Sequence, residues 1–171
     1  GQIHAVQANV RHAGSVEAAA RGADVVINLV GILFERGRQR FDTVQAYGAE
    51  QVALAAAAHG ARMIHVSAIA ADENSTSAYA RAKASGEKAV LAATPDAVIF
   101  RPSALFGPED DFFNKFAWLA RMSPVLPLIG GGQTMFQPVY VGDVAQAVAR
   151  VLAQAETAGK TYELGGPTVY T

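Results

Sequence analysis

The sequence predicts an α/β fold built around a doubly wound parallel sheet. Short apolar segments of strand length alternate with longer, alanine-rich segments of helical length along the 171 residues, and this alternation is typical of parallel sheets. The apolar segments are continuous runs, as in strands that are buried on both faces. Hydrophobic residues make up 51% of the chain, which is enough for a sizeable core in one globular domain.

In the first half of the chain, a glycine follows each predicted helix. Ser15 is a candidate N-cap for the first helix, and Gly22 and Gly60 stop the first and second helices. The expected strands cover residues 3–8 and 23–30, and the expected helices cover residues 15–20 and 41–59.

The second half continues the alternation. Pro95 stops a helix that carries several alanines, and a Pro/Gly-rich stretch at 123–132 follows an amphipathic helix. The aromatic residues of that amphipathic helix are expected to form the apolar face of a small lobe, or else a substrate or partner surface. The expected strands cover residues 61–67, 97–101, 136–141 and 161–164, and the expected helices cover residues 77–93, 111–122 and 143–155.

Composition excludes several classes of function. The formal net charge is −1 and the basic residues are scattered, so no nucleic-acid partner is expected. The longest apolar run, residues 25–34, is too short to span a bilayer. The chain has no cysteine, which excludes disulfides and thiolate chemistry and fits a reducing compartment. The four histidines are isolated in the sequence, so no metal site is predicted.

Tyr79 and Lys83 are the main candidate catalytic pair. They stand at positions i and i+4 of a predicted helix, so both side chains project from one face. A nearby ammonium favours the phenolate, so this pair could act as a general acid or base near neutral pH. Ser67, at the end of a predicted strand, precedes Tyr79 by twelve residues.

The order of strand, Ser, Tyr and Lys resembles the extended branch of the short-chain dehydrogenase/reductase family, which includes epimerases and dehydratases that depend on NAD. Three further segments resemble this branch in the same order: Asp24–Gly31, Arg101–Pro108 and Pro138–Ala145. The resemblance implies a Rossmann-like fold, with NADP or NAD as the cofactor.

The family's Gly-rich phosphate loop has no counterpart in the sequence. The resemblance begins at what would be the family's third strand, so we expect an incomplete copy that lacks the first two strands and is truncated at both ends. The strand at residues 23–30 would then present an open apolar edge that promotes association. The expected parts are a truncated dinucleotide-binding domain at 1–104, a small lobe at 105–141, and a return to the first domain at 142–171.

The resemblance also implies roles for single residues. Tyr79 would act on the substrate oxygen, Lys83 would lower the pKa of the phenol and bind the nicotinamide ribose, and Ser67 would orient the substrate. Ile69 stands where the branch usually has its serine, and Gln45 stands near the position of the relay Asn. The implied cofactor contacts come from Asn9, Val10, Leu29, Val30, Gly31, Val66, Ser67, Tyr79, Lys83, Pro102, Ser103 and Leu105.

Each of these roles has a plainer alternative. Tyr79 and Lys83 could form a ribose-binding or surface pair without chemistry, and Ser67 could simply end a strand. Asn9 lies where the family usually has an acidic residue beside the adenine, but a solvated loop Asn is an equal alternative. Arg101 is expected to pair with a carboxylate such as Asp143.

One subgroup resembles the chain more closely, namely the dehydrogenase-like accessory subunit of respiratory complex I and its bacterial homologues. The similar segments include Lys83–Lys88 and Gln137–Val141. We therefore expect a nucleotide-binding accessory subunit that does not turn over a substrate. The alternatives are an active oxidoreductase or epimerase, acting on a sugar nucleotide or sterol-like alcohol, and a redox sensor. The expected partners are respiratory subunits, at a cytoplasmic site peripheral to the inner membrane.

Overall fold

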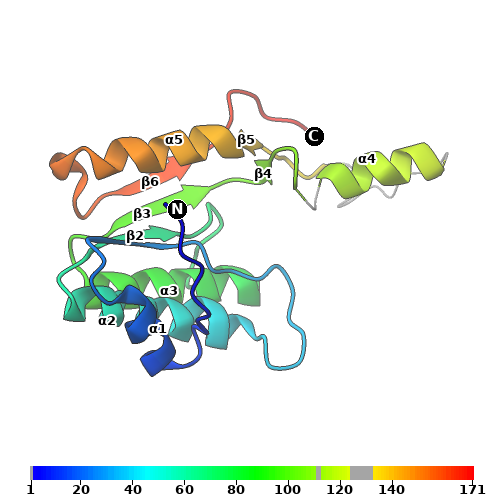
Figure 1. The fold of residues 1–171 in the computed structure, drawn as a ribbon. Helices are drawn as coiled ribbons and strands as arrows, with labels where there is room; N and C mark the ends of the chain where they lie inside the picture. Colours follow the sequence, from blue (N-terminus) through cyan, green and yellow to red (C-terminus); the bar gives the residue numbers. More distant parts are fainter. Residues whose placement is uncertain (1, 111–112, 124–132) are drawn as a thin grey trace. The chain divides into compact units, whose positions relative to one another are not determined.

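The structure, a computed structural model, describes residues 2–110, 113–123 and 133–171 (Figure 1). The chain divides into two compact units. The first unit comprises Gly1–Arg101 and Ala155–Tyr162, and the second comprises Pro102–Gln154 and Glu163–Thr171. The domain bounds expected at residues 104, 141 and 142 remain a prediction.

A four-stranded sheet forms the scaffold of the first unit, with the strand order β1-β2-β3-β6. The pairs β1–β2 and β2–β3 are parallel, which confirms the predicted α/β class. The last residue of β3 and the second half of β6 belong to the second unit. The bounds are β1 (Val25–Asn28), β2 (Arg62–Val66), β3 (Val98–Pro102) and β6 (Thr161–Leu164).

Three helices of the first unit pack against one another and against this sheet: α1 (Ala13–Ala20), α2 (Gly48–Ala58) and α3 (Ala78–Ala93). A π-helix, η1 (Asp42–Tyr47), leads directly into α2. Ser77 caps α3, since its hydroxyl accepts a hydrogen bond from the backbone N–H of Ala80 at 3.4 Å. Gly22 and Gly60 have φ values of +74° and +64°, as the predicted helix stops require.

Two expectations near the N-terminus are wrong. Residues 3–8 are exposed and form no strand, because no strand of the described residues pairs with them to satisfy their backbone groups. Ser15 is not an N-cap: α1 begins at Ala13, and the Ser15 hydroxyl accepts a hydrogen bond from the Asn9 N–H at 3.1 Å.

The strand expected at residues 23–30 is shorter and less buried than predicted. It forms β1, the edge strand of the sheet, and has β2 as its one neighbour. Ile27 is consequently 39% exposed and Leu29, just beyond the strand, is 70% exposed.

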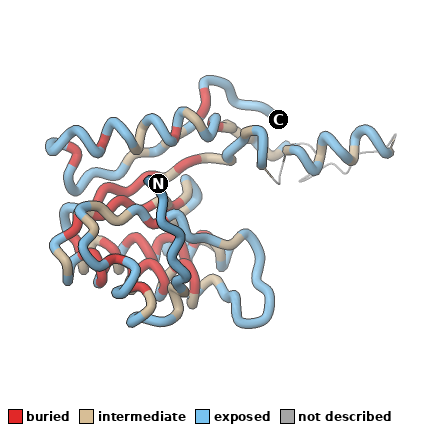
Figure 2. The backbone as a smooth tube through the Cα atoms, viewed as in Figure 1, coloured by how far each residue is buried: buried red, intermediate tan, exposed pale blue. Residues whose placement is uncertain are grey.

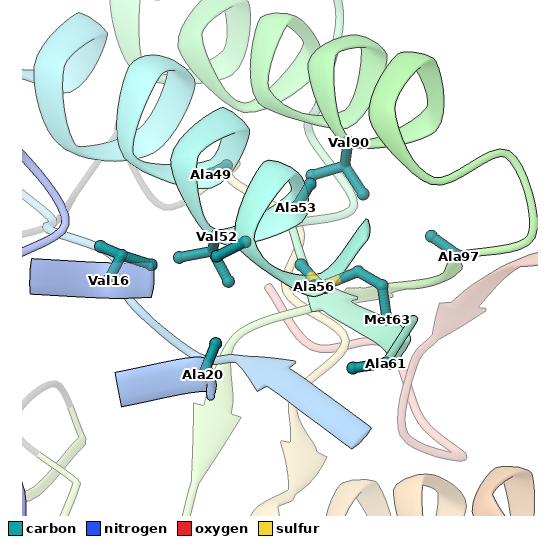
Figure 3. Close-up of a cluster of buried hydrophobic side chains, with 11 residues drawn as sticks. Val16, Ala20, Ala49, Val52, Ala53, Ala56, Ala61, Met63, Val90 and Ala97 are labelled. Carbon is teal, nitrogen blue, oxygen red and sulfur yellow. The ribbon is translucent and has the colours of Figure 1, made fainter. Parts of the chain in front are cut away.

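The core of the first unit lies where α1, α2, α3 and β2 meet (Figures 2 and 3). Alanines on α2 let the helices approach closely, and Met63 and Val90 are fully buried between them. Burying a side chain of this size contributes about 1.5–3 kcal/mol. The core residues are Val16, Ala20, Ala49, Val52, Ala53, Ala55, Ala56, Ala61, Met63, Val90 and Ala97.

In the second unit, a two-stranded parallel sheet joins β4 (Leu105–Phe106) and β5 (Val139–Tyr140). Helix α4 (Phe113–Met122) has no buried residue, and α5 (Val141–Leu152) follows β5 directly. The strand expected at 136–141 is therefore reduced to two residues. The first two residues of the helix expected at 111–122 and nearly all of the Pro/Gly-rich stretch lie outside the described residues. The short 3-10 helix η3 (Ala155–Thr157) returns the chain to the first unit.

Candidate functional site

Polar residues lie buried at the carboxyl ends of β1 and β2. Asn28 ends β1, and His65 and Ser67 face the same side of the sheet as the core residue Met63, because alternate strand residues share a face. Asn28 Nδ2 and His65 Nδ1 are 3.1 Å apart. Together with side chains from η1 and α3 they form a buried polar cluster, each member at most 5% exposed: Asn28, Gln45, His65, Ser67 and Lys83.

Helix α3 brings Tyr79 and Lys83 together, as their spacing predicts. The Lys83 Nζ atom lies 5.9 Å from the centre of the Tyr79 ring. The same nitrogen donates to the backbone carbonyl of Val66 at 3.5 Å, which places it beside the end of β2. Phe41 supports the phenol ring from the edge, with ring centres 5.6 Å apart and ring planes at 84°.

Burial dominates the ionisation of this pair. Desolvation raises the pKa of the Tyr79 phenol above its ordinary value. Desolvation also lowers the pKa of Lys83 to about 8, although the negative charge of Glu87 opposes this shift. Burial thus shifts the pKa of the Tyr79 phenol in the direction opposite to the one expected from Lys83, and the role of Lys83 toward the phenol remains a prediction.

His65 is a neutral member of the buried polar cluster. Burial, with a smaller contribution from the charge of Lys83, lowers its pKa to about 4. Its Nδ1 lies beside the Asn28 amide, and its Nε2 is buried without a partner in the described part of the chain. In the sequence, the feature that could have identified His65 is its position as a polar residue inside an otherwise apolar strand.

Gln45 lies inside η1 and is 1% exposed. Neither atom of its amide group has a hydrogen-bond partner among the described residues. A Cβ added at Gly31 would lie 3.9 Å from Gln45 Oε1 and 3.4 Å from Lys83 Nζ, so a side chain at this position would contact both groups. A buried amide without partners is rare in native proteins and indicates a site for a ligand or a water molecule.

An ion pair links α3 to β3. Arg101 donates to the carboxylate of Glu87 through Nε at 3.0 Å and Nη2 at 2.7 Å. The side chain of Glu87 is only 7% exposed. Arg101 thus pairs with Glu87, one helical turn after Lys83, where a carboxylate such as Asp143 was expected. The sequence did not single out Glu87.

A cavity of about 570 Å³ is lined in part by Gly31. Four predicted cofactor residues line it, namely Asn9, Val10, Val30 and Gly31. The remaining lining residues are Gln7, Ala8, Arg11, Ser15, Ile32, Gln39 and Val44. Arg11, which the sequence did not indicate, hydrogen-bonds Asn9 through its backbone N–H and its Nε.

The other predicted site residues are placed as follows. Ser67 Oγ is buried without a hydrogen-bond partner in the described part of the chain. Ile69 is 43% exposed, and Leu29 is not among the residues that line the cavity. Pro102, Ser103 and Leu105 lie in the second unit, so their contact with a cofactor remains a prediction.

The first unit has features that fit a dinucleotide. Gly31 leaves room for a ligand to approach the cluster closely, and the unpartnered atoms of Gln45 and Ser67 need hydrogen-bond partners. Among residues 2–110, 113–123 and 133–171, no group of three or more His, Cys, Asp or Glu residues could hold a metal ion. Within these same ranges, no helix has the length and apolar character needed to cross a bilayer.

The chain is similar to known proteins of one family. Residues 1–165 match the model of the "NAD dependent epimerase/dehydratase family". The chain is 44% identical over 174 residues to "NADH dehydrogenase [ubiquinone] 1 alpha subcomplex subunit 9, mitochondrial" of Arabidopsis thaliana, covering all of this chain and 43% of that protein. This finding confirms the resemblance to the complex I accessory subunit.

Two further similarities concern reductases. The chain is 38% identical over 156 residues to the ceramide reductase of Caulobacter vibrioides, covering 91% of this chain and 48% of that protein. The crystal structure of a dTDP-4-dehydrorhamnose reductase from Clostridium acetobutylicum superposes with a TM-score of 0.83. This match has 20% identity and covers 95% of this chain and 63% of the other, so it supports the Rossmann-like fold.

The chain spans slightly less than half of the length of these two sequence relatives. The family's dependence on NAD agrees with the predicted cofactor class, NADP or NAD. Three observations agree on the family. They are the order of Ser67, Tyr79 and Lys83, the buried polar cluster beside Gly31, and the match over residues 1–165. The chain belongs to the NAD dependent epimerase/dehydratase family.

Proposed function

We propose that the whole protein is a nucleotide-binding accessory subunit of an NADH:quinone oxidoreductase, and that it holds NAD(H) or NADP(H) without turning over a substrate. The cavity lined by Asn9, Val10 and Gly31 carries this proposal. Gly31 also lies beside Lys83 and Gln45 of the buried polar cluster. Similarity to the complex I subunit of Arabidopsis thaliana supplies the class of partner.

The proposed ligand lies with its adenine end beside Asn9 and Val10 and passes Gly31 toward Lys83. Bound nicotinamide supplies hydride chemistry in enzymes of this kind. Here Lys83 holds a ribose hydroxyl, and the ligand supplies hydrogen bonds to the amide of Gln45, which has no partner among the described residues.

Three observations support a site without turnover. The pKa of Tyr79 is raised by burial, so the phenol is a poor base near neutral pH. The exposed Ile69 stands where the resemblance places a serine that orients the substrate. Gln45 stands near the position of the relay Asn and is buried without a partner in the described part of the chain. Loss of orienting and relay groups costs orders of magnitude in rate.

The test uses the whole protein, tagged in its own cells and purified gently from detergent-solubilised membranes. We expect NADH:quinone reductase activity to co-purify, and the denatured eluate to release NAD(H) or NADP(H) on chromatography. Gly31→Leu, which fills the approach to Lys83, should abolish the nucleotide, whereas the control Gly14→Ala should retain it because nothing lies within 4 Å of that position. A protein that purifies alone and without nucleotide contradicts the proposal.

A second candidate function is an active NAD(P)-dependent oxidoreductase or epimerase. The intact pair of Tyr79 and Lys83 and the similarity to a ceramide reductase favour it. Under this alternative, Tyr79→Phe abolishes substrate-dependent hydride transfer in the whole protein. Under the accessory-subunit proposal, Tyr79→Phe leaves both co-purification and bound nucleotide unchanged.

The place of the protein in the cell is part of the same proposal. An accessory subunit of a respiratory complex would lie at the cytoplasmic face of the inner membrane and associate with it peripherally. The open edge of β1 would in addition favour pairing between copies of residues 1–171.

A further inference from the structure

The segment between β1 and η1 exposes two large apolar side chains. Residues 32–40, called the basic loop below, extend away from the helices of the first unit (Figure 1). All residues from 33 to 40 are exposed (Figure 2). Leu33 and Phe34 stand next to each other in this loop and are 73% and 72% exposed. Adjacent apolar side chains with so little cover, set among charged residues, indicate an interaction surface.

The basic loop has a fixed shape of its own. Arg36 and Gln39 exchange two backbone hydrogen bonds, each 3.0 Å long, around a turn in which Gly37 has a φ value of +56°. At the base of the loop, the Glu35 carboxylate accepts a hydrogen bond from the Phe41 N–H at 2.8 Å. Because the loop is already ordered by these bonds, binding a partner through it costs little further conformational entropy.

The charge of the basic loop is positive. Its arginines, Arg36, Arg38 and Arg40, outnumber its single acid, Glu35, so three positive charges less one negative leave a formal charge of +2. Glu35 is taken up by Arg40, whose Nε lies 3.3 Å from its carboxylate. In the part of the chain that the structure describes, Arg36 and Arg38 pair with no carboxylate. Arg11 brings a further guanidinium to the loop, since its Nη1 donates to the Arg38 carbonyl at 3.4 Å.

Apolar side chains beside unpaired guanidinium groups are complementary to the surface of an anionic bilayer. Lipid phosphates pair with the guanidinium groups at the level of the headgroups, and the acyl boundary just below takes up leucine and phenylalanine side chains. A purely acidic protein surface would satisfy the arginines but would leave the apolar pair against charged groups. Free anions in solution would leave that pair in water.

We propose that the basic loop docks this protein on an anionic lipid bilayer, with Leu33 and Phe34 entering the acyl boundary and Arg36 and Arg38 binding lipid phosphates. The inference rests on the proposed function for the presence of a membrane beside the protein, and it names the surface that meets this membrane. None of these four residues is among those that line the cavity of the first unit, so docking leaves the proposed nucleotide site open.

The experiment measures sedimentation of the purified whole protein with lipid vesicles. One set of vesicles contains phosphatidylcholine alone, and the other contains phosphatidylcholine mixed with phosphatidylglycerol. We expect the protein to bind the mixed vesicles at least roughly tenfold more tightly, because each arginine near an anionic surface contributes roughly fivefold. Added salt should weaken this binding, because it screens the charges.

Matched variants identify the surface responsible. Arg36→Gln should weaken binding to the mixed vesicles roughly fivefold. Arg21→Gln removes one exposed arginine at the end of α1 and should leave binding unchanged. Leu33→Gln should weaken binding roughly tenfold, since it removes the side chain that enters the bilayer. Leu54→Gln makes the same change on α2, where Leu54 is 47% exposed, and should have no effect.

The outcomes separate this inference from the proposed function. A protein that co-purifies with reductase activity but does not bind mixed vesicles overturns the inference and leaves the proposed function standing. Equal losses in the loop variants and in their controls overturn the role of the loop. Loop variants that bind vesicles normally but no longer co-purify with reductase activity assign the loop to a protein partner, which also overturns the inference. A protein that purifies alone and without nucleotide contradicts the proposed function, whatever the vesicles show.

Discussion

At the scale of single residues, the site is governed by the cost of burying charge. Lys83 is 5% exposed, and desolvation lowers its pKa to about 8 even with Glu87 nearby. The same cost keeps the Tyr79 phenol and the His65 ring neutral near neutral pH. A ligand that accepts hydrogen bonds from Lys83 would offset part of the free-energy cost of burying its charge. A binding site can therefore include a buried lysine.

The stability of the protein should depend on pH through His65. Its pKa is about 4 in the folded protein and about 6.5 in an unfolded chain. Between these values the unfolded state binds the extra proton, so folding stability falls as the pH drops from about 6.5 to 4. The loss from this one group is on the order of 3 kcal/mol.

Urea unfolding of wild type and His65→Gln across this pH range measures that contribution. The variant should lose less stability on acidification than the wild type, although carboxylates affect both equally. The control His4→Gln alters an exposed histidine and should retain the slope of the wild type. Identical slopes for wild type and His65→Gln would show that His65 is not the titrating group.

At the scale of secondary-structure elements, close packing between α3 and η1 positions the cluster. Gly86 on α3 faces the backbone carbonyl of Gln45, and an added Cβ there would overlap that oxygen. The glycine thus lets the two helical segments approach until Gln45 is buried beside Gly31. Ala49 lies in ordinary contact on the same side, at 3.5 Å from that Cβ position.

Gly86→Ala should therefore destabilise the protein. Because the obstructing atom belongs to the backbone, α3 and η1 must move apart, and overpacking of this kind costs about 1–3 kcal/mol. Thermal unfolding followed by circular dichroism measures the change.

Gly14→Ala, in α1, serves as the control. Nothing lies within 4 Å of an added Cβ there, so the higher helix propensity of alanine should leave stability unchanged or raise it slightly. Equal effects of the two substitutions would mean that Gly86 acts through propensity and not through contact with Gln45.

At the scale of the whole molecule, the sheet has an unpaired edge and the chain has two units. Among the residues that the structure describes, strand β1 pairs with β2 alone, so its other side has no strand partner there, next to the partly exposed Ile27. The first unit contains this edge and the Tyr79–Lys83 pair. It also contains the residues proposed to lie beside the adenine, Asn9 and Val10.

Residues 1–171 expressed alone should associate through β1. Ile27→Lys places a charge on the edge strand and should shift the protein toward monomer in sedimentation velocity experiments. Leu152→Lys is the matched control, because Leu152 is 41% exposed and Ile27 is 39% exposed, and the control lies in the second unit. Association that both substitutions weaken equally would point to a surface other than β1.

Features that depend on neighbours along the chain could be predicted from the sequence. The helix at 77–93 was expected to stop before Pro95, and the structure places it at Ala78–Ala93. The strand at 161–164 agrees at both ends. The contact between Tyr79 and Lys83 also followed from the sequence, because positions i and i+4 share one face in any helix.

Features that depend on distant parts of the chain were decided only by the tertiary structure. Residues 3–8 have a strand-like sequence but form no strand, because a strand requires a partner to satisfy its backbone groups. The pairing of Arg101 with Glu87 joins β3 to α3, two separate elements of the chain. The direction of the Tyr79 pKa shift likewise depends on how many atoms surround the phenol, a quantity that packing determines and local sequence does not.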